Sequence, residues 1–140
     1  MRAGVMVAGL ALLAMIGSAE TASAKITQYE CKFEQSRARG GGWIPEILII
    51  TEDDKSGELI AYDPIIKHFI GKPIPIRRSA ETKARVTYVW DLETRVREQS
   101  SKMTYTFSYF RNGQPAKMRV QPGGYDNVWA GEGTCKVGTK

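Results

Sequence analysis

The sequence predicts an all-β fold, a small antiparallel meander barrel of about seven strands with one short helix. Three observations support this prediction. Apolar and polar residues alternate along most of the chain, and turn-forming residues separate the alternating segments. The only two cysteines, Cys31 and Cys135, lie in the first and last of those segments. A two-sheet β-sandwich is the alternative that the same pattern allows.

Residues 1–24 have the features of a cleaved secretory signal peptide. Arg2 supplies a positive charge, residues 5–16 are apolar and uncharged, and Ala22-Ser23-Ala24 offers the small residues that a signal peptidase accepts. The twelve-residue apolar run is shorter than the roughly 20 residues that a transmembrane helix needs. We therefore expect one β-domain at residues 25–140, periplasmic or secreted, with no transmembrane segment in the mature chain.

The first strands are predicted close to the start of this domain. Residues 27–34 alternate, with Tyr29, Cys31 and Phe33 on one face, which is typical of a half-buried strand. A glycine run at residues 40–42 then predicts a loop. Residues 47–50 are apolar at every position, which predicts a strand covered on both faces. The polar turn at residues 52–57 leads to a partner strand at residues 58–62.

One short helix is predicted after this hairpin. Asp63 can cap its first turn, Pro64 suits the first helical position, and Gly71 can end it. The segment at residues 72–76 must then be extended, because Pro73 and Pro75 disfavour the α conformation in the residues before them.

Four further strands are predicted in the second half of the chain. Their inward-facing residues are Val86, Tyr88, Trp90 and Leu92; Met103, Tyr105, Phe107 and Tyr109; Ala116, Met118 and Val120; and Trp129, Gly131, Gly133, Cys135 and Val137. Asn112-Gly113 predicts a type I′ hairpin turn. Gly131 and Gly133 on an inward face predict a bend, or a neighbour packed closely against the backbone.

Export to an oxidising compartment predicts that Cys31 and Cys135 form a disulfide. Because these residues lie in the first and last predicted strands, the bond makes those strands neighbours and closes the sheet. This argument favours the barrel. In the sandwich, the same disulfide would instead join two sheets.

Motifs for catalysis, metals and cofactors are absent from the sequence. His68 is the only histidine, and a lone histidine beside an aromatic residue is more typical of packing or capping than of a general base. The chain has no nucleophile elbow, zincin motif, calcium loop or phosphate loop. We therefore expect no enzyme activity, no metal and no cofactor. One alternative stays open, because two carboxylates that meet across strands can hydrolyse glycosidic bonds.

Positive charge is concentrated in the middle of the chain. Residues 72–119 carry eleven basic and four acidic residues, a net charge of +7, whereas residues 25–71 carry −2. The candidate surface for an anionic partner consists of Arg77, Arg78, Lys83, Arg85, Lys117 and Arg119. Acidic polysaccharide, a lipid head group or an exported protein are the candidate partners. The alternative is an ordinary solvated surface whose basic residues protect strand edges from aggregation.

Phe110 and Arg111 form a second candidate contact. Alternation places Phe110 on an outward face beside Arg111, at a predicted hairpin tip. Nucleic acid is not expected as a partner, because Tyr88 and Tyr109, which can stack on bases, belong to the faces assigned to the core.

The two ends of the domain resemble those of the small periplasmic inhibitors of c-type lysozyme. Tyr29-Glu30-Cys31 is similar to the family's opening Tyr-x-Cys, and Gly133-Thr134-Cys135 is similar to its closing cysteine. The resemblance implies a β-barrel but no functional residue, because the family's Ser-Gly-x-x-Tyr inhibitory loop has no counterpart here. We therefore expect an exported, non-enzymatic β-domain that binds an anionic or small apolar partner. The alternatives are an inhibitor of an exported hydrolase and an envelope structural protein.

Overall fold

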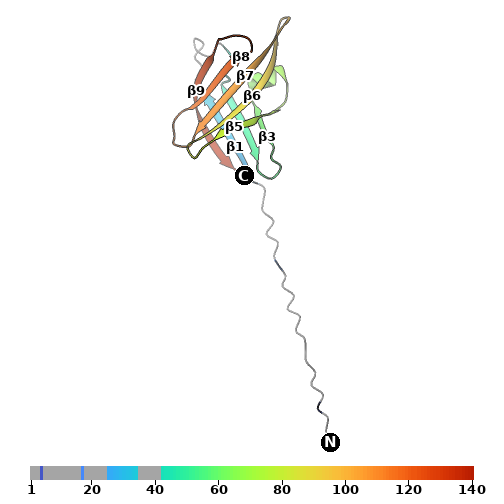
Figure 1. The fold of residues 1–140 in the computed structure, drawn as a ribbon, viewed down its shortest axis with the longest axis vertical. Coiled ribbons are helices and arrows are strands. Elements are labelled where there is room, and N and C mark those ends of the chain that lie inside the picture. The colour runs from blue at the N-terminus through green and yellow to red at the C-terminus, as the bar shows by residue number, and fades with distance from the viewer. Residues whose placement is uncertain (1–3, 5–16, 18–24, 35–41) are drawn as a thin grey trace.

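A computed structural model describes residues 4, 17, 25–34 and 42–140. Within these residues the chain forms one antiparallel sheet that curls into a nearly closed barrel (Figure 1). The predicted signal peptide at residues 1–24 lies almost wholly outside the described residues, as does most of the predicted glycine loop at residues 40–42.

The described residues contain nine strands and one helix. The strands are β1 (Ile26–Phe33), β2 (Ile47–Asp53), β3 (Leu59–Tyr62), β4 (Ile74–Pro75), β5 (Arg77–Glu81), β6 (Arg85–Val96), β7 (Gln99–Phe110), β8 (Ala116–Pro122) and β9 (Trp129–Thr139), and the helix is α2 (Pro64–Phe69). The two strands beyond the expected number are β4 and β5. β4 lies in the segment predicted to be extended, and β5 follows it where the sequence predicted only a connection.

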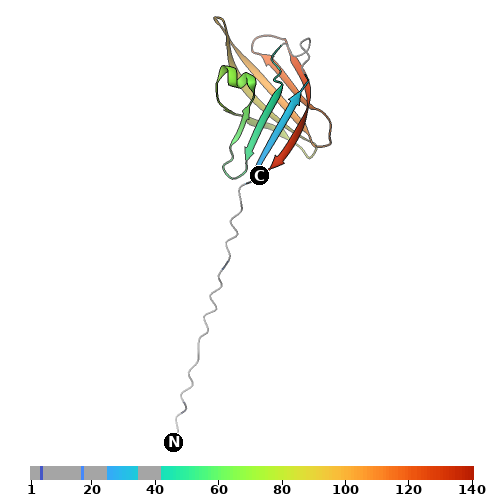
Figure 2. The same ribbon diagram turned by 180° about the vertical axis from the view of Figure 1, so that it is seen from behind.

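The sheet closes where the two ends of the domain meet. Its strand order is β4-β3-β2-β1-β9-β8-β7-β6-β5. Consecutive strands therefore pair with each other, except that β4 does not pair with β5. The first strand, β1, also pairs with the last, β9. Cys31 of β1 is the register partner of Cys135 of β9, and the two form a disulfide. Figures 1 and 2 show the two sides, with β6–β8 in front in the first view and β1–β3 in front in the second. The predicted barrel and disulfide are confirmed, and the sandwich is not formed.

The opening of the barrel lies in the middle of the chain, between β4 and β5. Ile76 separates these two edge strands, and its N–H donates to the Leu59 carbonyl at 2.9 Å. Pro75 has no N–H, so β4 cannot offer a continuous row of donors to another strand. The chain therefore leaves β3 after two β4 residues and pairs with β6 instead.

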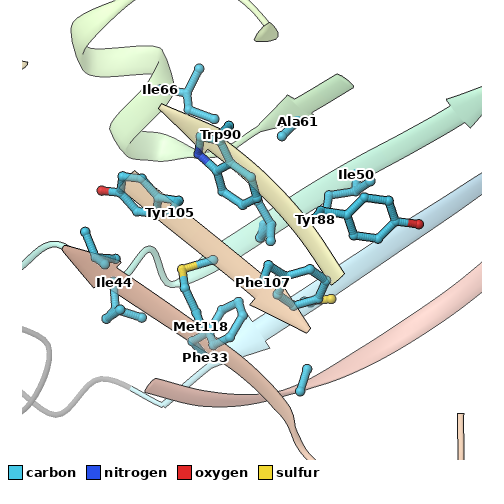
Figure 3. Packing of buried hydrophobic residues seen from close by; sticks show 14 of the residues in the cluster. Phe33, Ile44, Ile50, Ala61, Ile66, Tyr88, Trp90, Tyr105, Phe107 and Met118 are labelled. Carbon is cyan, nitrogen blue, oxygen red and sulfur yellow. The ribbon is translucent and has the colours of Figure 1, made fainter. Parts of the chain in front are cut away.

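Large apolar side chains fill the interior (Figure 3). Tyr88, Tyr105 and Phe107 are fully buried, and the Trp90 and Tyr105 rings stack with centroids 5.5 Å apart. Ile66 of α2 is also fully buried, because the helix packs against β6 at one end of the barrel. The predicted inward faces of β1, β6, β7 and β8 are confirmed by their alternating burial.

The predicted burial of both faces of β2 is wrong. Leu48 and Ile50 point into the core and are completely buried, but Ile47 is 36% exposed and Ile49 is only half-buried. The sheet is curled around a single core, so only its concave face is packed. An apolar run with no polar residue on its outer face therefore still forms a one-sided strand.

The predicted type I′ turn at Asn112-Gly113 is also wrong. Only Gly113 has a positive φ, of 85°, and the connection from β7 to β8 takes all the residues between Phe110 and Ala116. A type I′ turn needs positive φ at both central residues. The tighter turn lies between β6 and β7, where Arg97 has a φ of 58°.

The helix and the inward-facing glycines follow the predictions. Asp63 caps α2, and Gly71 ends it with a φ of 85° while its N–H donates to the Ile66 carbonyl at 3.1 Å. A Cβ atom on Gly131 would lie 2.9 Å from Ile44 Cγ2, and one on Gly133 would lie 2.9 Å from Phe33 Cδ1. Glycine is required at both positions because neighbouring groups pack directly against the backbone.

Candidate functional site

Four of the predicted basic residues lie on the outer surface of β5–β8, the side that faces the viewer in Figure 1. We call this surface the basic face and define it by Arg77, Arg85, Lys117 and Arg119. Arg77 and Arg119 end one cross-strand row, which is completed by Val89 of β6 and Thr106 of β7. Arg85 and Lys117 are exposed and alternate with buried residues, which places them on the same outer side.

The cations of the basic face lack direct carboxylate contacts in the described residues, although Glu132 of β9 is the register partner of Lys117. None of its four side chains forms an ion pair with a carboxylate in the described part of the chain. Lys117 Nζ lies 5.9 Å from the centroid of the Phe110 ring, and the Thr87 and Ser108 hydroxyl groups hydrogen bond to each other at 2.9 Å. The surface thus combines cations that lack carboxylate partners with the half-buried hydroxyl-bearing residues Thr106 and Ser108, which suits an anionic, oxygen-rich ligand.

Arg78 and Lys83 do not belong to the basic face. Lys83 is exposed in the turn between β5 and β6. Arg78 is the register partner of Tyr88 of β6, an inward-facing residue. Its guanidinium forms ion pairs with Glu52 and, at 3.0 Å, with Glu81. Adjacent residues of a strand point to opposite faces, so Arg78 turns inward beside the outward Arg77.

The second predicted contact, Phe110 with Arg111, is only partly available. Phe110 points outward as predicted, but it is half-buried. The Arg111 guanidinium pairs with Glu81 at 3.0 Å and also donates to the Thr82 carbonyl. Arg111 therefore ties the β7–β8 hairpin to the β5–β6 turn.

A charged network bridges the opening of the barrel. Glu52 of β2 pairs with Arg78 of β5, and it accepts a hydrogen bond from the Tyr88 hydroxyl at 3.3 Å. The Arg78 guanidinium also lies 5.9 Å from the centroid of the Tyr88 ring. These contacts join strands on opposite sides of the opening, where backbone pairing is missing.

Two carboxylates meet in this network, as the hydrolytic alternative requires. Glu52 and Glu81 both contact the Arg78 guanidinium. A glycosidase needs one carboxyl group that acts as a general acid, whereas both of these carboxylates form ion pairs with the same guanidinium. The arrangement therefore favours a role in closing the barrel.

An aromatic cleft of about 330 Å³ lies at the end of the barrel that carries α2. It is lined by Gly42, Trp43, Pro64, Ile65, His68 and Phe69. The Trp43 and Phe69 rings stack with centroids 6.0 Å apart. His68 is exposed and meets Phe69 edge-on at 4.8 Å.

Two buried polar atoms lie at this end of the barrel without a hydrogen-bond partner among the described residues, namely Asp63 Oδ2 and Trp90 Nε1. Asp63 Oδ1 accepts hydrogen bonds from the backbone N–H groups of Ile65 and Ile66 at 2.8 and 2.7 Å. Burial raises the pKa of Asp63 to about 6, against the opposing effect of these two hydrogen bonds. Burial also raises the pKa of the Tyr105 hydroxyl, and the Asp63 charge adds to this effect.

Within the described residues, no three histidine, cysteine or acidic side chains gather into a group suited to a metal ion. The same residues include no helix with the length and apolar character needed to cross a bilayer. In comparisons with known proteins, no family model, curated protein or solved structure matches the chain.

Sequence reasoning missed the cleft and the role of Glu52. The helix cap was recognisable from Asp63-Pro64, but capping residues usually lie at the surface, so its burial had no local signal. Trp43 follows a glycine run and belongs to no periodic segment. The stacking of its ring on Phe69 therefore could not be predicted from the sequence pattern.

Proposed function

We propose that this chain is an exported, non-enzymatic binding domain whose basic face recognises an acidic polysaccharide. The observation that carries the proposal is the unpaired state of Arg77, Arg85, Lys117 and Arg119 on one continuous outer surface. Guanidinium and ammonium groups without carboxylate partners can bind carboxylate or sulfate groups of a ligand.

The layout of the basic face suits an extended ligand. Arg77 and Arg119 lie three strand spacings apart in one row, which corresponds to about 14 Å. A linear polymer that carries repeated negative charges can contact both arginines along this row. The same surface carries the half-buried residues Thr106 and Ser108 and a half-buried aromatic ring, Phe110, to which sugar rings can also bind.

Two features support export. The first is the disulfide between Cys31 and Cys135, a bond that forms and persists in oxidising compartments. The second is the signal-like pattern of residues 1–24. The barrel interior is filled by its own side chains, which favours recognition at the surface over carriage of a ligand inside the barrel.

The proposal is tested by removing the charges of the basic face. The test variant replaces Arg77, Arg85, Lys117 and Arg119 by glutamine, and the control variant replaces Lys25, Lys55, Lys67 and Lys72 by glutamine. Both variants lose the same charge from exposed positions. Affinity for polygalacturonate and dextran sulfate is measured by calorimetry at two salt concentrations.

We expect the test variant to lose about ten-fold or more in affinity and most of the salt dependence, while the control variant keeps both. Equal losses in the two variants would show that only net charge matters, and this would contradict a specific face. Binding to anionic lipid vesicles without binding to either polysaccharide would contradict the assigned ligand class.

A further inference from the structure

Two consecutive aspartates, Asp53 and Asp54, lie where β2 ends, and each holds a different part of the chain. Asp53 Oδ1 accepts hydrogen bonds from the backbone N–H groups of Lys55 and Ser56 at 3.0 and 3.4 Å, so it orders its own turn. Asp54 Oδ1 instead accepts a hydrogen bond from the backbone nitrogen of Lys25 at 2.7 Å, 29 residues away in the sequence. The Asp54 carboxylate therefore contacts the chain at the start of the β-domain.

Backbone hydrogen bonds hold Lys25 in this position. The Lys25 carbonyl accepts a hydrogen bond from the Asp54 backbone N–H at 3.1 Å. The next residue, Ile26, is the register partner of Asp53, and it exchanges two backbone hydrogen bonds with Lys140, at 3.1 and 2.8 Å. Lys25 and Asp54 are both exposed, so their contact depends on these neighbouring bonds and not on burial.

The Lys25 nitrogen is also the atom that removal of the predicted signal peptide changes. The small residues Ala22-Ser23-Ala24 predict a signal-peptidase cut between Ala24 and Lys25. In this reaction water adds across the peptide bond. Its oxygen stays on Ala24 as part of a carboxylate, and its two protons convert the Lys25 N–H into an α-ammonium group.

We propose that Asp54 is the docking site of the α-ammonium group that signal removal creates at Lys25. This inference rests on the proposed export of the chain and not on the ligand of the basic face. The nitrogen already lies at hydrogen-bond distance from a carboxylate oxygen, so cleavage replaces a neutral donor with a charged one at the same place.

No side-chain cation competes for this contact. Among the described residues, no lysine, arginine or histidine side chain forms an ion pair with Asp54. The mature chain therefore holds a charged tie between the start of β1 and the β2–β3 turn, whereas the precursor holds only a neutral hydrogen bond there.

The first test is the mass of the product when residues 1–140 are expressed in a bacterium that has a periplasm. We expect the mass of residues 25–140 with the Cys31–Cys135 disulfide. A product that begins at any other residue would overturn the proposal, because its α-amine would not lie at Asp54. Polysaccharide binding by the basic face is measured separately, so failure of the ligand assignment leaves this result unchanged.

The second test measures the pairing itself in the product that begins at Lys25. Its α-amine is treated with acetic anhydride at pH 7, and mass spectrometry of peptides follows the reaction at that nitrogen. Only the unprotonated amine reacts, and a nearby carboxylate favours the ammonium form, so the pairing slows the reaction. We expect Asp54→Asn to react about three-fold faster or more.

Asp126→Asn is the control variant, because Asp126 is an exposed aspartate in the connection from β8 to β9. We expect its α-amine to react at the rate of the unsubstituted product. An equal rate in Asp54→Asn and the unsubstituted product would overturn the proposal, as would the same acceleration in both variants.

Discussion

At the residue scale, the surroundings of Asp63 have two opposing effects on its pKa. One carboxylate oxygen caps α2 through two backbone N–H groups, which favours the ionised form. The other oxygen is buried without a partner, which favours the protonated form. Burial has the larger effect and raises the pKa to about 6 in the folded chain, from 3.8 as the reference value.

This shift predicts that Asp63 destabilises the fold at neutral pH. The folded state holds the proton of Asp63 more tightly than the unfolded state does. The contribution of the protonated carboxyl to folding stability is therefore fully present below about pH 4 and is lost as pH rises through about 6. We expect Asp63→Asn to raise the free energy of unfolding by about 2 to 3 kcal/mol at pH 7 and to flatten its pH dependence. Urea unfolding from pH 4 to pH 8 measures both, and an unchanged pH profile in the variant would contradict the assignment.

At the element scale, β5 carries two arginines whose side chains act on opposite sides of the sheet. Arg77 belongs to the unpaired basic face, and Arg78 belongs to the Glu52–Arg78 network that bridges the barrel opening. β5 is exposed along its whole length and pairs only with β6. Its contact with the strands across the opening is the ion pair between Arg78 and Glu52.

The two arginines are matched controls for each other. We expect Arg78→Met to lower the free energy of unfolding by about 1 to 2 kcal/mol, because it leaves a partly covered Glu52 without its cation. We expect Arg77→Met to change stability by less than about 0.5 kcal/mol and to weaken polysaccharide binding instead. Denaturant unfolding and calorimetry measure the two effects. A similar stability loss in both variants would mean that the network does not hold the opening closed.

At the scale of the whole molecule, the disulfide joins the two ends of the domain across a sequence separation of 104 residues. It lies within the β1–β9 ladder, where Cys31 is fully buried and Cys135 is half-buried. A crosslink that encloses most of the domain restricts the unfolded chain strongly. The bond therefore stabilises the closure on which the barrel depends.

Replacement of Cys31 and Cys135 by alanine is expected to lower the free energy of unfolding by about 4 kcal/mol. The β1–β9 hydrogen bonds remain possible in the variant, so we expect the same fold with a lower denaturation midpoint. Circular dichroism of the folded state and urea unfolding test this expectation. A free energy of unfolding equal to that of the oxidised chain would contradict the stabilising role.

Local patterns in the sequence determined most of the strands, the helix cap and the inward faces of β1, β6, β7 and β8. A strand has a period of two residues, so alternation identifies the inward set, such as Tyr88, Trp90 and Leu92, without knowledge of any partner strand. The disulfide also followed from the sequence, because the only two cysteines of a chain with a predicted export signal have one possible pairing. It was this pairing that predicted the closed barrel.

Only the tertiary structure decided where the barrel opens and which charges remain free. Arg77 and Arg78 are neighbours in the sequence, but their roles depend on Glu52, which lies on a strand that never pairs with β5. The burial of Asp63 and the stacking of Trp43 on Phe69 likewise depend on segments brought together by folding. A local pattern records which way a side chain points along its own strand, whereas its partner across the fold is set by how the whole sheet curls.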